Sequence, residues 1–218
     1  MTQLAVSRVD PQTPGTHENM HHGMLLPNQP SKSMGTCPVT GLPMEQMMAQ
    51  CMKDGTPGEM HKHLEGMVGT WNAQVTMYMP GSTEPMTSTG KMVTKAIQGG
   101  RFTLSEFTGE MMGQPFTGTL LCGYNNVEQR FENVWIDSMS TGMQFSTGEP
   151  SVDGKSVTYL STMRMNIPTP PGGKFTMTQR QVVKHISPDE CVVEFYQSAG
   201  AMAETKAMEI RYTREPMQ

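Results

Sequence analysis

Residues 71–81 read Trp71-Asn72-Ala73-Gln74-Val75-Thr76-Met77-Tyr78-Met79-Pro80-Gly81. Until Pro80, one set of alternate positions is apolar and the other is mostly polar. Successive side chains of a β-strand point to opposite faces, so this alternation predicts a strand with one buried face. Pro and Gly favour turns, so the chain is expected to reverse direction directly after the strand.

The same pattern of an alternating run followed by a turn recurs as far as residue 213. After the first strand, the expected strands cover residues 86–97, 101–109, 115–124, 129–137, 141–147, 156–165, 174–185, 190–198 and 205–213. The breaks include Gly99-Gly100, Asn125-Asn126 and Gly148-Glu149-Pro150. An open meander leaves two unpaired edges, and closing it into a barrel removes them. The sequence therefore predicts an all-β fold, an antiparallel meander of about ten strands closed into a barrel.

Two further segments precede the expected barrel domain of residues 69–214. Residues 1–42 contain Met and His but few large apolar side chains, so we expect a flexible tail that cannot offset its ordering entropy. Residues 43–68 are expected to be helical. Apolar or sulfur-containing residues follow there at helical spacing: Met44, Met47, Met48, Cys51 and Met52. A second short helix is expected from Pro57 to about Val68.

Composition narrows the possible partners. The chain has 218 residues and a formal net charge of −4, without a block of like charges, so nucleic acid is not an expected partner. No apolar run approaches the roughly 18 residues of a spanning helix, so no membrane partner is expected. Residues 1–10 lack the pattern of a secretory signal, which favours a cytoplasmic location and four reduced cysteines.

Methionine is unusually abundant, with 24 residues spread along the chain. Met is a flexible gap-filler that can replace Leu and Ile in a core. Its thioether is also a soft ligand that suits Cu(I). The even spread favours the packing interpretation.

Gly69-x-Trp71, at the start of the first strand, resembles the opening of lipocalins and fatty-acid-binding proteins. In those families the Trp closes one end of the barrel and packs against an Arg near the last strand. The resemblance implies that Trp71 is a barrel plug and that Arg211 or Arg214 is its partner. A guanidinium over an indole ring contributes about 1 kcal/mol.

A second resemblance covers roughly residues 60–214. Its motifs come in order: His63-x5-Gly69-x-Trp71, Gly99-Gly100-Arg101-Phe102, Gly113-x-Pro115-Phe116-x-Gly118, Gly123-Tyr124-Asn125, Trp135-x-Asp137-Ser138 and Met208-Glu209-Ile210-x-Tyr212-x-Arg214. Together they resemble a widespread bacterial domain family of unknown function that is thought to form a calycin-like β-barrel. The resemblance implies the fold and carries over no catalytic residues. From the residues themselves, Gly118 and Gly123 predict bends or bulges within one strand.

A barrel of this kind is expected to bind a small, mostly apolar molecule in its interior. This is the leading functional hypothesis, and it rests on analogy of fold. The expected ligand-binding residues are Arg101, Glu106, Tyr124, Trp135, Arg211 and Tyr212.

The tail supports an alternative hypothesis, a copper(I)-handling protein with copper as its possible cofactor. Five imidazole or thioether donors lie within eight residues: His17, Met20, His21, His22 and Met24. This combination suits Cu(I), and the barrel would then act as a scaffold.

A third hypothesis is an interaction module, in which the Met stripe of residues 44–52 docks onto a partner or a second copy of the chain. Catalysis has no positive support in the sequence, which contains no Gly-x-Ser-x-Gly elbow and no evident Cys–His arrangement. Cys122 and Cys191 lie in apolar strand runs, so we expect them to be buried and inert.

Overall fold

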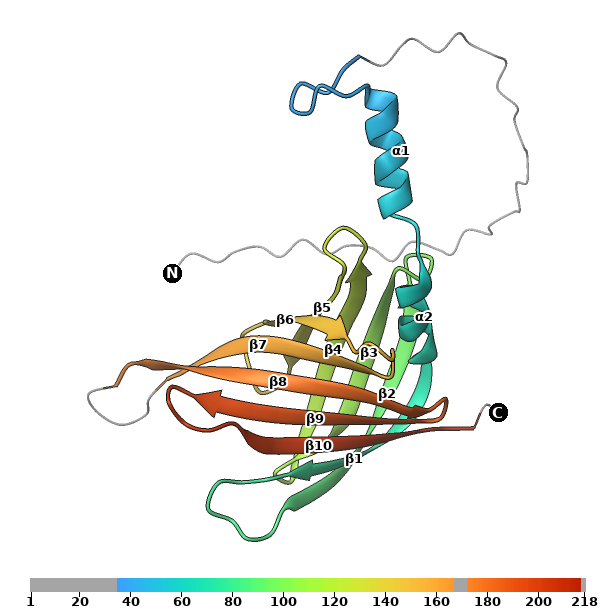
Figure 1. Cartoon of the computed structure of the whole chain (residues 1–218). Helices are drawn as coiled ribbons and strands as arrows, with labels where there is room; N and C mark the ends of the chain where they lie inside the picture. Colours follow the sequence, from blue (N-terminus) through green and yellow to red (C-terminus); the bar gives the residue numbers. More distant parts are fainter. Residues whose placement is uncertain (1–34, 167–171, 217–218) are drawn as a thin grey trace, which may run out of the picture. The chain divides into compact units, whose positions relative to one another are not determined.

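The structure is a computed structural model that describes residues 35–166 and 172–216. The predicted copper cluster at residues 17–24 lies outside these ranges and stays a prediction. Two helices, α1 (Met44–Asp54) and α2 (Glu59–Gly66), come first in the described chain (Figure 1). The strands follow as β1 (Gly69–Met77), β2 (Met86–Ile97), β3 (Phe102–Met111), β4 (Gln114–Asn125), β5 (Arg130–Asp137), β6 (Gln144–Pro150), β7 (Ser156–Asn166), β8 (Lys174–Ser187), β9 (Glu190–Ala199) and β10 (Thr205–Arg214).

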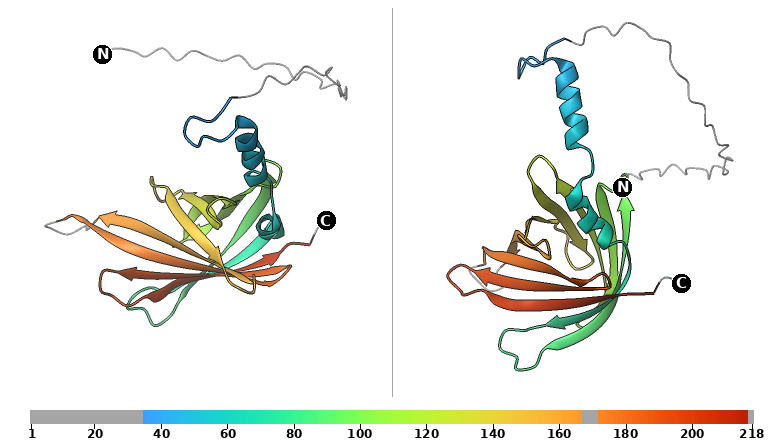
Figure 2. Two further views of the ribbon diagram at one scale, coloured as in Figure 1. Left: turned by 45° about the horizontal axis from the view of Figure 1, so that its top comes forward. Right: turned by 45° about the vertical axis from the view of Figure 1, so that its right-hand side comes forward.

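The ten strands form one closed antiparallel barrel in which each strand pairs with its neighbours in the sequence. β1 and β10 close the ring, with Trp71 opposite Arg214 and Met77 opposite Met208. Figure 2 shows the curvature of the sheet from two further directions. The ten-stranded all-β barrel confirms the architecture that alternation and turns predict.

One predicted break is wrong. The turn residues Gly148-Glu149-Pro150 predict a break, whereas β6 continues to Pro150, which pairs with Val157. Gly148 faces inward, and a side chain there would collide with the ring of Tyr159, since an added Cβ would lie 2.5 Å from its Cδ1. This glycine makes room for an aromatic ring, and Pro150 stands at the end of the strand, where a missing N–H is tolerated.

The glycines within β4 have the same role. An added Cβ at Gly118 would lie 2.2 Å from the Trp135 ring, and one at Gly123 would lie 2.4 Å from Cδ1 of Phe102. The pairing of β4 with β3 and β5 runs through both positions without a shift in register. The predicted bends at Gly118 and Gly123 are therefore wrong, because these glycines leave space for neighbouring rings.

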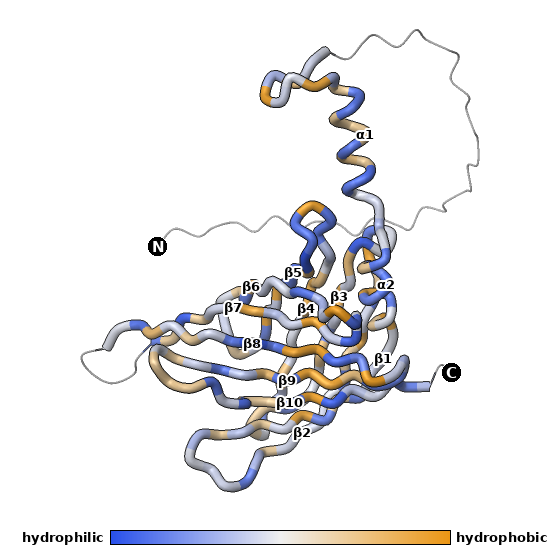
Figure 3. The backbone as a smooth tube through the Cα atoms, in the orientation of Figure 1, coloured by the Kyte–Doolittle hydropathy of each residue, from blue (hydrophilic) through white to orange (hydrophobic). Residues whose placement is uncertain are grey.

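Burial alternates along the strands as expected for a barrel. In β1, four side chains at alternate positions are buried: Trp71, Ala73, Val75 and Met77. The colours of Figure 3 show the corresponding alternation of hydrophobic and hydrophilic residues. The inward side chains of most strands form the core.

α2 packs against the end of the barrel at which β3 begins and β4 ends. Leu64 of α2 is buried in a cluster with Cys122, Phe131, Val157 and Tyr159. We call this end, together with Trp71 and its contacts, the packed end. The helix begins with His61 Nδ1 accepting a hydrogen bond of 3.0 Å from the Gly58 N–H.

Trp71 and Arg214 join α2 to the first and last strands. Trp71 is 1% exposed, its Nε1 donates to Met67 O at 2.9 Å, and the Arg214 guanidinium lies 4.0 Å from its ring centroid. Arg214 also donates to Val68 O at 2.6 Å and to Gly66 O at 2.7 Å. This is the guanidinium-on-indole contact that the sequence predicts, with Arg214 and not Arg211 as the partner.

Gly69 permits that contact. Its φ of +131° is unfavourable for other residues, and an added Cβ would lie 2.7 Å from Arg214 Nη1. A side chain at position 69 would therefore displace the guanidinium as well as strain the backbone. The Gly69-x-Trp71 motif is explained by this close approach.

The predicted helix of residues 44–52 is present as α1, and none of its residues is buried. Its stripe includes Met48 and Met52, which are 49% and 73% exposed. Docking through this stripe stays a prediction. Neither described helix has the length and hydropathy that a membrane crossing requires.

Candidate functional site

The barrel encloses a cavity of about 460 Å³. All ten strands contribute inward side chains to its lining, and α2 contributes His63 and Leu64. Small-molecule pockets in proteins range from about 300 to 1,000 Å³ and are mostly apolar. The cavity is therefore large enough for a small organic ligand.

One side of the lining is hydrophobic. It comes from β1, β2, β9 and β10, and we call it the apolar wall: Val75, Met77, Met92, Val193, Phe195, Met208 and Ile210. Three of these seven side chains are methionines, whose flexible thioethers adapt to ligands of different shape. The abundance of Met in the sequence thus has one of its uses in the lumen.

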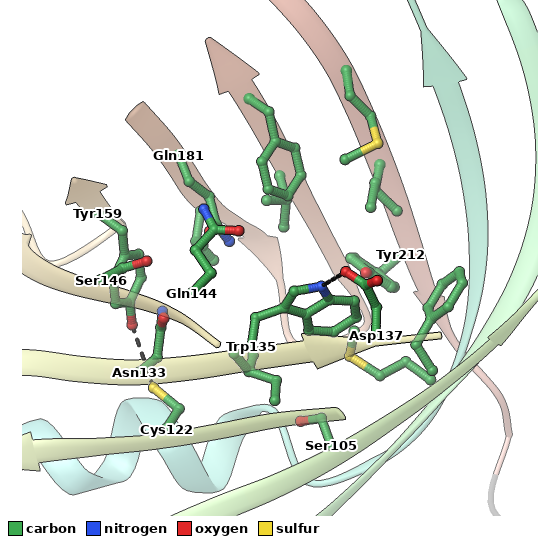
Figure 4. Close-up of a pocket in the computed structure, with 18 of the residues that line it drawn as sticks. Ser105, Cys122, Asn133, Trp135, Asp137, Gln144, Ser146, Tyr159, Gln181 and Tyr212 are labelled. Carbon is green, nitrogen blue, oxygen red and sulfur yellow. Dashed lines mark hydrogen bonds between the residues drawn. The ribbon is translucent and has the colours of Figure 1, made fainter. Parts of the chain in front are cut away.

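The opposite side is polar but uncharged. It comes from β5, β6 and β8, and we call it the polar wall: Asn133, Gln144, Ser146, Gln179 and Gln181. Gln144 Nε2 donates to Ser161 Oγ at 2.8 Å and to Gln179 Oε1. Figure 4 shows the carboxamides of Gln144 and Gln181 close together on this side. Amide and hydroxyl groups can here form hydrogen bonds inside a mainly apolar cavity.

Trp135 stands between the two walls. Its Nε1 donates to Asp137 Oδ2 at 2.9 Å, the bond drawn in Figure 4, and its ring stacks on Phe116 with centroids 6.4 Å apart. The other carboxyl oxygen of Asp137 accepts from the Met139 N–H at 2.9 Å. Because Gly118 lies directly beneath the ring, Trp135 is held as a half-buried aromatic surface that faces the cavity.

Ionisable groups of the lining lie toward the two ends. His63 and His185 are at the packed end, with ring centroids 5.9 Å apart. Burial, and then the nearby His63, lowers the pKa of His185, which favours its neutral form. Glu110 and Asp137 are at the ends of β3 and β5 that lie away from α2.

Two buried thiols also belong to the barrel interior. Burial raises the pKa of Cys122 to about 11, although the Tyr159 hydroxyl, 3.5 Å from Sγ, partly opposes this shift. Burial raises the pKa of Cys191 to about 12. Both cysteines therefore remain thiols at neutral pH, and neither has the environment of a nucleophile.

Of the predicted ligand-binding residues, Trp135 and Tyr212 line the cavity. Glu106 and Arg211 are exposed on the outer face, where Arg211 pairs with Glu190. Arg101 donates from Nε to Gly55 O at 2.7 Å, outside the lumen. The inward placement of these three side chains was wrong, because Glu106 lies between the inward Ser105 and Phe107, and Arg211 lies between Ile210 and Tyr212.

Tyr124 packs in the cluster beneath α2 and does not line the cavity. Its ring meets Phe131 at a centroid distance of 4.9 Å and His61 at 5.9 Å. Tyr124 therefore has a packing role at the packed end, and its predicted ligand contact stays a prediction.

The polar wall was missed by the sequence analysis. The sequence gives only a weak indication of it: Gln179 and Gln181 flank Arg180, and Asn133 lies two residues before Trp135. Residues two apart in a strand share a face, so an inward Trp135 implies an inward Asn133. Polar residues on a core face are unusual enough to indicate a site.

The solved structures to which this chain is similar include the following two. Rv2717c from M. tuberculosis is 14% identical, with a TM-score of 0.50 over 74% of this chain and 100% of that one. The S-type phycobiliprotein lyase CPES from Guillardia theta is 10% identical, with a TM-score of 0.46 over 74% and 95% of the two chains. At these identities the likeness concerns the fold alone. No curated protein matches the sequence. The family model described as "Protein of unknown function (DUF1579)" matches residues 56–214, and the chain belongs to this family.

Proposed function

We propose that the barrel binds a small, mostly apolar molecule in its lumen. The observation that carries this proposal is the cavity of about 460 Å³, which the inward side chains of the ten strands leave unfilled. Protein interiors are normally close-packed, and voids larger than a water molecule are few. A cavity of this size inside an otherwise packed barrel is best explained as space for a ligand.

The lining supports this interpretation. Transfer of apolar surface from water to the apolar wall favours binding by about 25 cal/mol per Å². Trp135 adds a flat aromatic surface, and the polar wall adds hydrogen-bonding groups that can orient the ligand. Burial of apolar surface would thus provide the affinity for the ligand, and hydrogen bonds would orient it.

The neighbouring leucines of β4 allow a matched test. Leu120 lines the cavity, whereas Leu121 is 40% exposed on the outer face. Leu120→Trp would fill part of the lumen, and Leu121→Trp makes the same chemical change outside. Titration with the neutral dye Nile red should give saturable fluorescence enhancement for the wild type and for L121W. We expect at least a ten-fold weaker affinity for L120W.

Thermal unfolding of both variants is the control for folding. Equal dye affinity in L120W and L121W, with both folded, would contradict binding in the lumen. Absence of saturable dye binding to the wild type would also count against the proposal. Native mass spectrometry of the protein purified from its host would show whether a small molecule copurifies.

A further inference from the structure

The lumen contains no cationic side chain of Lys or Arg among the residues that the structure describes as its lining. The Lys and Arg side chains of the strands lie on the outer face, except Arg214 at the packed end, and most of them pair with carboxylates. These pairs include Lys91–Glu215, Arg130–Glu132, Arg180–Glu204, Lys184–Glu194 and Arg211–Glu190. A ligand in the lumen would therefore find no guanidinium or ammonium partner.

β8 shows how the strand separates cations from amides. Gln179 and Gln181 face the lumen, and Arg180 between them points outward. The Arg180 guanidinium lies 4.1 Å from the ring centroid of Tyr196 and pairs with Glu204 at 2.6 Å. These contacts hold the charge on the outer face, so only the carboxamides of this segment are presented to a ligand.

Three ionisable groups of the lining do not supply the missing positive charge: His185, Glu110 and Asp137. The lowered pKa of His185 disfavours its imidazolium form beside His63. Glu110 and Asp137 are acidic and would repel an anion that enters from their end of the barrel. An ionised carboxylate taken from water into such a lumen would lose its hydration without gaining a counter-ion, which is far more costly than burying a neutral polar group.

Part of the polar wall is open to a hydrogen-bonding ligand. Asn133 and Ser146 stand opposite each other in the register of β5 and β6, and they are 6% and 9% exposed. The polar-wall bonds within the described chain join Gln144 to Ser161 and Gln179. The side chains of Asn133, Ser146 and Gln181 have no side-chain partner among the described residues. A primary amide has two donors and an acceptor, so it matches a carbonyl, amide or hydroxyl group of a ligand. This unused hydrogen-bonding capacity is available to a ligand in the cavity, because all three residues line it.

We propose that the lumen is selective for uncharged ligands, with an apolar body against the apolar wall and a neutral amide, carbonyl or hydroxyl group against Asn133 and Ser146, and that it rejects carboxylates. This inference rests on the proposed function and deepens it. It distinguishes the barrel from a carrier of fatty-acid anions, since the cation that such an anion needs is absent from the described lining.

A pair of probes that differ only in the polar head tests the selectivity. Decanamide and decanoate have the same chain length, and only decanoate is charged at pH 7.5. Each is titrated against the Nile red complex of the wild-type protein. We expect decanamide to displace the dye at a concentration at least ten-fold below that of decanoate. Equal displacement or a preference for decanoate would overturn the selectivity and leave the proposed function standing, whereas failure of Nile red itself to bind would count against the proposed function.

Two variants locate the selectivity at the polar wall. Asn133→Leu removes the amide at similar volume, and we expect it to weaken decanamide binding at least five-fold and more than it weakens Nile red binding. Asn72→Leu, on the exposed face of β1, is the matched control and should change neither. Gln181→Lys introduces a cation into the lumen and should shift the preference toward decanoate, whereas the neutral Gln181→Met should not. Unchanged decanamide affinity in a folded N133L variant would exclude the assigned contact.

Discussion

The two tryptophans of the chain lie in regions with opposite properties. Trp71 at the packed end is 1% exposed, and its ring, its N–H and the Arg214 above it are all engaged in contacts within the protein. Trp135 is half-buried, and one side of its ring faces the cavity. The packed end thus uses its aromatic residue for stability, and the lumen keeps its own available for contact with a ligand.

The difference separates two tasks along one barrel. At the packed end, buried apolar side chains and the hydrogen bonds of the Arg214 guanidinium connect α2 to the first and last strands. Beyond it, the strands leave space and carry amides where a core would carry aliphatic residues. Stability is therefore expected to depend on the packed end, and binding on the walls of the lumen.

The largest expected effect is the loss of the plug. Trp71→Ala should lower the free energy of unfolding by about 3–5 kcal/mol, because it leaves a cavity in a region that cannot collapse easily. Trp135→Ala is the matched variant. It should lower the free energy of unfolding clearly less than Trp71→Ala does, and it should weaken Nile red binding more. Urea unfolding and dye titration of both proteins measure the difference. An equal loss of stability in the two variants would contradict the different roles assigned to Trp71 and Trp135.

A buried hydroxyl tests whether the packed end is dry. Cys191→Ser is nearly isosteric, but Cys191 is 1% exposed in an apolar cluster, so the serine would lose hydration. We expect a loss of about 1–3 kcal/mol in the free energy of unfolding. The same change at the exposed Cys51 should have little effect. A neutral outcome at Cys191 would show that this end admits water.

Gly118→Ala addresses the support of Trp135. The added methyl group would collide with the indole ring and push it into the lumen. Overpacking of this kind costs about 1–3 kcal/mol, and we expect Nile red affinity to fall as well. Gly142→Ala, in a more open site, is the control. Unaltered Trp fluorescence and dye binding in G118A would show that the ring position is unimportant for binding.

His185 predicts a pH dependence for the end of the cavity beneath α2. Its folded-state pKa is lowered by burial and by His63, so the unfolded chain binds more protons. Stability should therefore decrease as the pH falls below the unfolded value of about 6.5. His185→Gln should remove part of this decrease between pH 7 and pH 5 in urea unfolding. An identical pH profile in the variant would contradict the assignment.

The smallest effect concerns a buried hydroxyl near the apolar wall. Ser88 Oγ is buried without a hydrogen-bond partner among the described residues. Ser88→Ala should leave the unfolding free energy unchanged or raise it by up to about 1 kcal/mol, because the unsatisfied group disappears. A clear loss of stability would show that the hydroxyl has a partner, such as a bound molecule. Thr87→Ala, on the exposed neighbour, is the control.

Much of the architecture could be predicted from the sequence, whereas most of the site could not. Alternation and turn residues located all ten strands, and Gly69-x-Trp71 with Arg214 located the plug. The predicted positions of several site residues were wrong because neighbouring residues of a strand point to opposite faces of the sheet. Arg211 and Tyr212 are neighbours in one strand, so they could not both face the lumen, and only Tyr212 does.

The sequence by itself determined where the chain forms strands and where it turns, because period-two patterning and turn chemistry act between near neighbours. Only the tertiary structure decided which face is the lumen in strands such as β5 and β8, since these carry polar residues on both faces. It also decided that Gly118 makes room for Trp135 and that a cavity remains between Asn133 and the apolar wall. These features depend on side chains from different strands, which meet only when the strands pair and the barrel closes.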